Sequence, residues 1–333
     1  MKKTLIGIVA AMTLPAIAQG AGIQQVELEG FIDIVWAVSD GTDEGVNGSE
    51  GHFYTSGELD LKTKLNGPIS MRLDADLNPA DGDNDSGRLE QAFLTWAIDN
   101  NLSLKAGVFN NNLGFEKEDA PELYQVTHGQ LWDIWNLSTF GLDGNNLQGI
   151  ELSYKQADFT AFVGFLNDLG DVPEENSIKL GATVTAVKDV TITAGLITQD
   201  EGNPGTPSLE NIIDINALWK FDGNLTLGGE LMLPSEIIDS GLMLMANYQV
   251  NPKLSGTLRY DMVAYDGSGV DDTTSLTIAG LYSIEDNLFA NAEIRINSDD
   301  NTPTASSFID GVYGHSIGEG DGTTVHLELL ATF

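Results

Sequence analysis

The chain has no cysteine and few basic residues. Among its 333 residues, 15 are Lys or Arg and 50 are Asp or Glu, which gives a formal net charge of −35. Nucleic acid is therefore disfavoured as a partner, because phosphate binding needs clustered Lys and Arg. The acidity serves solubility or adaptation to a salty habitat, and in a channel it would also attract cations to the entrance. Composition alone leaves these interpretations open.

Long apolar runs are also absent, so no membrane-spanning helix is expected. Such a helix needs roughly 20 apolar residues, whereas the apolar run near the N-terminus covers only residues 5–14. This run follows two lysines and precedes a small-x-small sequence at residues 16–18, an order that is typical of a secretory signal peptide. We therefore predict a signal peptide over residues 1–18, rather than a retained membrane anchor, and one mature domain over residues 19–333.

Most of the remaining sequence alternates between apolar and polar residues, which is the period of a β-strand with two unlike faces. Sixteen such segments can be recognised, most of them about ten residues long or longer, and a tilted strand of this length crosses a bilayer. They lie near residues 25–38, 52–65, 68–78, 88–98, 101–110, 147–156, 158–167, 176–186, 189–199, 210–221, 224–233, 240–250, 253–265, 273–284, 287–297 and 323–333.

The connections between these segments alternate in length. Short turns rich in Asn, Asp, Gly and Pro, such as Asn66-Gly67-Pro68 and Asp222-Gly223-Asn224, follow every second segment. Longer loops separate them, near residues 39–51, 79–87, 111–146, 168–175, 200–209, 234–239, 266–272 and 298–322. Alternation of this kind is typical of an outer-membrane barrel, in which one rim carries short turns and the other carries long loops.

These features predict an all-β fold: a transmembrane antiparallel β-barrel of about 16 strands, or of 14 or 18 if one hairpin is misassigned. A soluble β-sandwich also alternates between apolar and polar residues. It is disfavoured by the leader, by the length of the segments and by the alternating connections. It is disfavoured further by the last segment, whose apolar stripe ends at Phe333, as a strand that stops at a membrane interface would.

The third long loop, residues 111–146, differs from the others. It has no period of two, and a loop of this length inside a compact domain is usually functional or disordered. Its aromatic and aliphatic residues argue against disorder. Its acidic residues include Glu116, Glu118, Asp119 and Glu122, and its aromatic residues include Tyr124, Trp132, Trp135 and Phe140.

At this loop the sequence resembles Gram-negative outer-membrane porins. The stretch of residues 89–96, with Lys105-Ala106-Gly107-Val108-Phe109, Leu113-Gly114-Phe115-Glu116 and residues 147–154, is most similar to the OmpL-like β-barrel porins. The resemblance implies a third loop folded into the lumen as a constriction, an outer-membrane location and a homotrimer. It also implies contact with the lipid bilayer and lipopolysaccharide. General porins often place a basic cluster on the wall opposite loop acids, and bases are sparse here.

We predict a water-filled channel for the passive diffusion of small hydrophilic solutes and ions. The loop acids Glu116, Glu118, Asp119 and Glu122 would form the constriction, opposite basic residues on the polar faces of the strands: Lys62, Lys64, Arg72, Lys105, Arg259 and Arg295. Each base could instead form a local pair with a neighbouring acid. Acids outnumber bases on these faces, so we expect cation preference. The predicted wall acids are Glu27, Glu29, Asp33, Glu58, Asp60, Asp74, Asp76, Glu151, Asp261, Glu293 and Glu328.

Three alternatives remain at this point. The loop aromatics could form a sugar track, which would make the channel substrate-specific, although packing of the loop on the wall explains them better. The lumen could be plugged, or the barrel could be a hydrolase, although no Gly-x-Ser-x-Gly motif appears. We predict no enzyme activity, no cofactor and no metal site, because the four histidines lack ligand spacing. The acidic run at Asp81, Asp83 and Asp85 departs from a calcium-binding loop in its Gly and Glu positions.

Overall fold

A computed structural model describes most of the chain and confirms the predicted fold. The described residues are 22–39, 51–65, 67–77, 88–135, 145–167, 176–198, 211–235, 238–265, 272–298 and 322–333. The predicted signal peptide, the acidic run at residues 81–85 and Phe140 lie outside this part. Among the described helices, none is long and apolar enough to cross a membrane.

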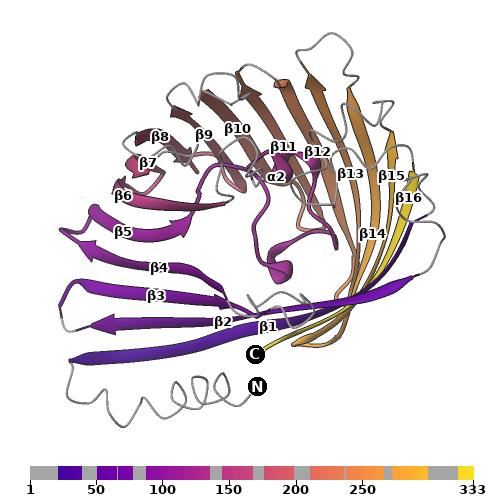
Figure 1. Cartoon of the computed structure of the whole chain (residues 1–333), viewed down its shortest axis with the longest axis horizontal. Coiled ribbons are helices and arrows are strands. Elements are labelled where there is room, and N and C mark those ends of the chain that lie inside the picture. Colours follow the sequence, from indigo (N-terminus) through magenta and orange to yellow (C-terminus); the bar gives the residue numbers. More distant parts are fainter. Residues whose placement is uncertain are drawn as a thin grey trace.

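Sixteen antiparallel strands form one closed barrel, in which each strand pairs with its neighbours along the chain (Figure 1). Neither 14 nor 18 strands is therefore correct. The strands are β1 (Ile23–Ser39), β2 (His52–Leu65), β3 (Ile69–Asp76), β4 (Arg88–Ala97), β5 (Leu102–Asn110), β6 (Asn146–Lys155), β7 (Phe159–Asn167), β8 (Asn176–Val184), β9 (Val190–Thr198), β10 (Asn211–Lys220), β11 (Leu225–Pro234), β12 (Ile238–Asn251), β13 (Leu254–Tyr265), β14 (Thr273–Glu285), β15 (Leu288–Ser298) and β16 (Gly322–Thr332).

The barrel closes where β1 pairs with β16. The register runs from Phe31 opposite Thr332 to Ser39 opposite Thr324. Two further hydrogen bonds extend the pairing, because Gly30 N donates to Phe333 O at 3.1 Å and Phe333 N donates to Gly30 O at 3.0 Å. Closure leaves no unpaired sheet edge, which is the condition for a β-structure to sit in lipid.

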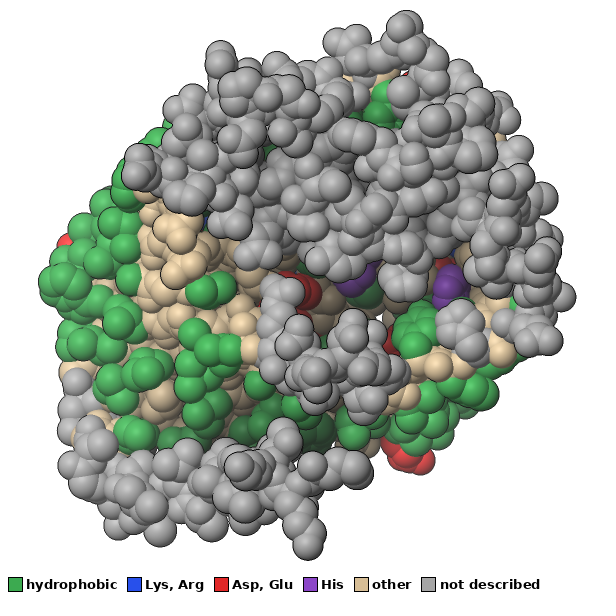
Figure 2. Space-filling model, in the orientation of Figure 1, with side chains coloured by type: hydrophobic (Ala, Val, Ile, Leu, Met, Phe, Trp, Pro, Cys, Tyr) green, Lys and Arg blue, Asp and Glu red, His purple; other side chains and the backbone are tan. Residues whose placement is uncertain are grey.

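The strands place polar side chains on the inner face of the barrel and apolar side chains on the outer face, which is the reverse of a soluble protein. In β14, Ser275 and Thr277 are 1% and 0% exposed, while Leu276 and Ile278 between them are 37% and 53% exposed. The same alternation runs through the other strands, and hydrophobic side chains gather along the outer wall (Figure 2). An apolar outer face and a polar inner face fit a barrel surrounded by lipid and filled by water or protein.

The short turns follow the expected chemistry. The Asp99 carboxylate accepts hydrogen bonds from Asn101 N at 2.8 Å and Leu102 N at 2.9 Å, and these bonds lower the pKa of Asp99. Asp222 accepts the same pair of bonds in the turn between β10 and β11. In that turn Gly223 has a φ of +84°, which glycine adopts without steric cost. These Asx-type turns fix the register of the hairpins on which the lumen side chains are arranged.

Candidate functional site

The described part of the third long loop, residues 111–135, runs inside the barrel (Figure 1). We call this segment the lumen loop. It contains the 3₁₀ turn η3 (Ala120–Glu122) and the short helix α2 (Gln130–Trp135). The helix lies against β12 and β13, whereas η3 lies near β16. Because the loop leaves the wall at the end of β5 and reaches β12, β13 and β16, it crosses the lumen.

A buried arginine on β13 holds the middle of the lumen loop. The Arg259 side chain is 0% exposed and forms ion pairs with Glu116 of the loop at 2.8 Å and with Asp261 of the wall at 2.9 Å. Its guanidinium also donates to the backbone oxygens of Thr127 at 2.7 Å and His128 at 3.1 Å. One side chain thus joins the wall to two places in the loop, with the planar fork that Arg provides.

Other wall groups hold the loop from β10 and β15. Glu293 accepts hydrogen bonds from Val126 N at 2.7 Å and from Thr127 N at 3.1 Å. Arg295 donates to the His128 backbone oxygen at 3.0 Å. On β10, Asp214 accepts a hydrogen bond from Gly114 N at 3.1 Å. These bonds satisfy loop backbone groups that would otherwise be buried without partners.

Apolar packing fixes the C-terminal half of the lumen loop. Leu131, Ile134 and Trp135 are at most 2% exposed and belong to one cluster with wall residues of β10 to β13. Trp132 is 7% exposed, and its ring stacks on the His128 ring with centroids 4.3 Å apart. Trp135 therefore packs the loop onto the wall, whereas Trp132 stacks on a residue of the loop itself. Of the aromatic residues considered for a sugar track, Tyr124 does line a cavity.

Three cavities surround the tip of the lumen loop. The largest, about 700 Å³, lies between the tip and strands β1 to β5. Cavities of about 360 Å³ and 550 Å³ lie on other sides of the tip. Two of the predicted wall acids, Glu29 and Asp60, line the 700 Å³ cavity. It is also lined by three of the predicted wall bases and three of the predicted loop acids: Lys62, Arg72, Lys105, Glu118, Asp119 and Glu122. The structure thus brings these six residues together, with the bases on the wall and the acids on the loop.

The other predicted site residues lie elsewhere. Glu116 and Arg259 pair in the attachment of the loop, where Glu116 also lines the 360 Å³ cavity, and Arg295 lies beside them. Lys64 is exposed near the end of β2 and is not among the residues that line these cavities. The predicted set therefore contains residues of the 700 Å³ cavity, residues that attach the loop and one lysine at a strand end, and Glu116 both attaches the loop and lines the smaller cavity.

Each of the three cavity bases also has an acidic neighbour on the wall. Lys62 lies 2.6 Å from Glu29, and Arg72 lies 2.6 Å from Asp74. The third, Lys105, lies 3.8 Å from a carboxylate oxygen of β6. The local pairing considered from the sequence is therefore present, and it coexists with a position facing the cavity.

The sequence analysis did not single out Lys179 of β8. Its side chain is 0% exposed, forms an ion pair with Glu151 at 2.7 Å and donates to Asn112 Oδ1 in the lumen loop at 2.9 Å. The signal was available, because the neighbours of Lys179 in the strand are Ile178 and Leu180. Alternation therefore places Lys179 on the polar face.

Burial shifts the pKa values of the loop acids. It raises the pKa of Glu116, and the nearby Arg259 charge opposes this shift. It also raises the pKa of Glu118, while hydrogen bonding to Asn145 acts in the opposite direction. Both shifts follow from the cost of keeping a carboxylate charge away from water.

We expect Glu116→Gln to loosen the lumen loop with little effect on ion selectivity. The amide keeps the shape of Glu116 but removes the charge that pairs with buried Arg259, and a hydrogen bond to a charged group contributes about 1.5–3 kcal/mol. The urea midpoint of unfolding should fall, while the reversal potential in a salt gradient should stay close to that of the wild type. A large change in reversal potential would show that Glu116 does face the permeating ions.

We expect acidification to weaken the loop attachment through His128. Burial lowers the pKa of His128 from 6.5 to about 4 in the folded protein, so the unfolded chain binds more protons between these values. The contribution of neutral His128 to the free energy of unfolding is therefore complete above pH 6.5 and is lost as the pH falls towards about 4. In the neutral ring, Nε2 donates to Lys117 O at 2.8 Å.

The matched variant for this prediction is His128→Gln, whose amide can donate to the same carbonyl but does not titrate. The urea midpoint of the wild type should fall more between pH 7.5 and pH 5 than that of the variant. Equal changes in the two proteins would assign the acid sensitivity to the carboxylates instead.

Comparison with known proteins agrees with the geometry. A family model described as "Putative beta-barrel porin-2, OmpL-like" matches residues 65–333. Among solved structures, the outer membrane channel DcaP of Acinetobacter baumannii is similar, with 14% identity, a TM-score of 0.67, and coverage of 94% of this chain and 98% of that chain. A triple mutant of the Rhodopseudomonas blastica porin has 14% identity, a TM-score of 0.58 and coverage of 93% and 100%. No curated protein matches the sequence. At these identities the structural matches establish the fold.

Proposed function

Because the chain belongs to the family of OmpL-like β-barrel porins, we propose that it is an outer-membrane channel for the passive diffusion of small hydrophilic solutes and ions, with a preference for cations. The observation that carries this proposal is the charged cavity of about 700 Å³ between the lumen loop and the wall. Family and fold point to a channel rather than an enzyme. Export would use residues 1–18 as a signal peptide, which the mature outer-membrane protein would lack.

The width of the barrel supports diffusion. A closed barrel of sixteen strands is wide enough to leave an aqueous channel. The lumen loop narrows this channel, and the remaining space is divided among cavities lined largely by polar and charged side chains. Solutes that pass would have to be small and hydrophilic, since a narrow polar passage favours them over larger or apolar molecules.

The surplus of acids in the lumen supports cation preference. The 700 Å³ cavity is lined by five acids, Glu29, Asp60, Glu118, Asp119 and Glu122, and by four bases, Lys62, Arg72, Lys105 and Lys117. On the loop, Glu122 is exposed and lines both the 700 Å³ and the 360 Å³ cavities. A lumen with this charge balance concentrates cations and repels anions.

A substrate-specific channel is the second candidate within the same class. Tyr124 is the observation that favours it, because this residue lines the 360 Å³ cavity together with Asn112, Gln125 and Asn216. An aromatic ring with amide groups nearby could contact a sugar. The buried positions of Trp132 and Trp135 weigh against an extended aromatic track.

The membrane surroundings follow from the outer face. Lipid would cover the exposed apolar belt, and lipopolysaccharide would surround the rim of the long loops. By analogy with general porins, the protein would be a homotrimer. Chemical cross-linking of the folded protein in detergent tests this state, and a purely monomeric product would contradict it.

Liposome swelling tests the diffusion proposal directly. Proteoliposomes containing the refolded protein should swell in isosmotic solutions of small sugars, at rates that fall smoothly as solute mass increases. Protein with closed barrels but no swelling would mean that the lumen is plugged. If one sugar enters much faster than the others, and its rate of uptake saturates as its concentration rises, the substrate-specific channel would be favoured instead.

A further inference from the structure

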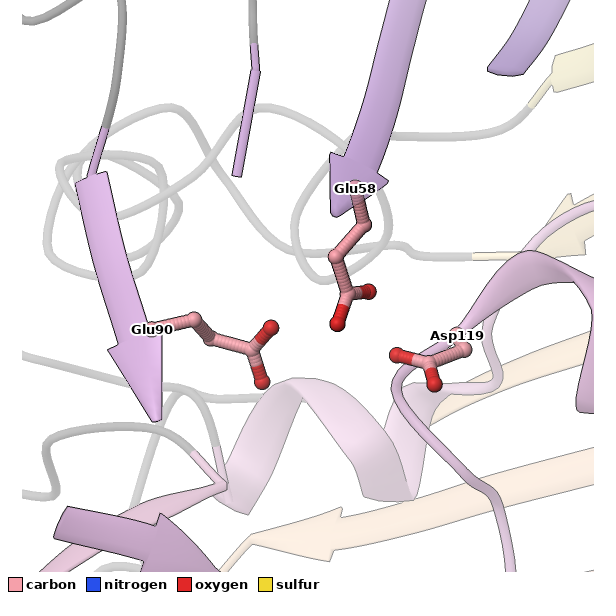
Figure 3. Close-up of side chains that lie close together, drawn as sticks. All are labelled: Glu58, Glu90 and Asp119. Atoms are coloured by element: carbon pink, nitrogen blue, oxygen red, sulfur yellow. The ribbon is translucent and has the colours of Figure 1, made fainter. Parts of the chain in front are cut away.

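Three carboxylates from separate elements meet beside the tip of the lumen loop. Glu58 comes from β2, Glu90 from β4 and Asp119 from the loop, and their side chains point towards one another (Figure 3). One carboxylate oxygen of each lies within 4.8 Å of the corresponding oxygens of the other two. A second group, Glu58 with Asp60 and Asp74, meets the same distance and shares Glu58.

The carboxylate of Glu90 has no partner for its charge. Glu90 is 1% exposed, neither of its carboxylate oxygens accepts a hydrogen bond from a described N–H or hydroxyl group, and its neighbour Glu118 is another carboxyl group. Its side chain points into the space between Glu58 and Asp119 (Figure 3). One buried oxygen of Glu58 and one of Asp119 likewise lack a donor. A buried carboxylate without hydrogen bonds or counter-charge is costly, so an unseen positive ligand would relieve the site.

The nearest basic side chain is already engaged. Arg72 pairs with Asp74 at 2.6 Å and with Asp60 at 3.3 Å. No Lys or Arg of the described chain forms an ion pair with Glu58, Glu90 or Asp119. If the three groups are to be ionised together, a positive charge from outside this part of the chain is needed.

Calcium has the chemistry that this site calls for. Ca²⁺ binds six to eight oxygen ligands at about 2.3–2.6 Å, so two oxygens bound to the same ion lie at most about 5 Å apart. We propose that Glu58, Glu90 and Asp119 bind one divalent cation of the calcium type, which links the lumen loop to the wall of the barrel. Ca²⁺ suits the site better than Mg²⁺ because it accepts irregular geometry, whereas Mg²⁺ requires a near-ideal octahedron.

Neighbouring groups complete the oxygen-rich surroundings. Glu118 adjoins the site and is oriented by hydrogen bonds from Asn145 and Asn146. The side-chain oxygen of Asn146 is buried without a donor, so it offers a further neutral ligand. Water would supply the remaining ligands.

The proposed site has a consequence for the channel. Arg259 holds the loop on the β13 side, and a cation at Glu58 and Glu90 would hold it on the β2 and β4 side. Since Glu118 and Asp119 also line the 700 Å³ cavity, a bound divalent cation would reduce the negative charge there. Calcium would then both steady the loop and lower the cation preference. Binding itself does not depend on conduction, so it can be tested separately from the proposed function.

Calorimetric titration of the refolded protein tests the site. The protein is prepared in detergent without lipopolysaccharide, whose phosphates bind divalent cations, and is treated with a chelator before CaCl₂ is added. We expect one saturable site in the wild type and at least a tenfold loss of affinity in Glu90→Gln and Asp119→Asn. Glu285→Gln, the same change at an exposed turn, should bind like the wild type. Absence of saturable binding, or equal binding in Glu90→Gln, would overturn the proposal.

Thermal unfolding gives a second test. The direction in which Glu90→Gln changes the melting temperature distinguishes a metal-ligating role of Glu90 from a purely structural one. With a chelator present, Glu90→Gln should melt at or above the wild type, because it removes repulsion between like charges. When calcium is added, the melting temperature of the wild type should rise and that of the variant should not. A variant that melts lower under both conditions would assign Glu90 a packing role and overturn the proposal. If Glu90→Gln does not fold, Asp119→Asn provides the same comparison from the loop.

Discussion

Replacing Arg259 with methionine is expected to release the lumen loop and lower the free energy of unfolding by about 3–5 kcal/mol, the usual cost of removing one partner of a buried ion pair. The substitution leaves the Glu116 and Asp261 carboxylates buried without their cation. It also removes donors from the backbone oxygens of Thr127 and His128.

Urea unfolding followed by tryptophan fluorescence measures this effect, since Trp132 and Trp135 lie in the loop. Lys188→Met is the control, because the Lys188 side chain is 92% exposed and its ion pair lies in solvent. A released loop should also make single-channel currents noisier. If Arg259→Met unfolds at the same urea concentration as the wild type, the loop is held by its apolar contacts alone.

Reversing the charge of Glu122 is expected to produce the largest change in ion selectivity. Glu122 lines two of the cavities described around the loop tip, and it forms no ion pair with any residue that the structure describes. In water, one unit charge about 4 Å from an ion changes its energy by about 1 kcal/mol, which is roughly a fivefold change in local concentration. Glu122→Lys should therefore lower the ratio of cation to anion permeability about fivefold or more.

The reversal potential in a potassium chloride gradient, measured with a chelator present, reads this ratio. Glu285→Lys makes the same charge change at an exposed turn and should leave the ratio almost unaltered. Because Glu122 is exposed, the variant should fold like the wild type. A ratio equal to that of the wild type would mean that ions do not pass the loop tip on this side.

The strands were predictable because a membrane barrel imposes alternation on nearly every residue. The segment predicted at residues 287–297 corresponds to β15, and the last predicted segment corresponds to β16. Turn residues gave the hairpin order in the same way. The boundaries shifted by one or two residues at most ends, as fraying and bulges determine where pairing stops.

The different roles of the acidic residues in the lumen loop could not be predicted from the sequence. Glu116 and Glu122 belong to one acidic run with no regular period, so both were predicted to have the same role. Their difference depends on Arg259, which lies 143 residues from Glu116 in the chain. The meeting of Glu58, Glu90 and Asp119 depends in the same way on where the loop descends. Local pattern carries no information on such contacts, because they are set by tertiary packing.

The reversal potential of the wild-type channel tests the central claim most directly. The refolded protein would be placed in a planar bilayer across a potassium chloride gradient, with a chelator on both sides. An acidic lumen narrowed by the lumen loop predicts stepwise conductance and a potential of the sign that marks cation preference. A potential of the opposite sign would contradict the account, and so would the absence of current from correctly folded barrels.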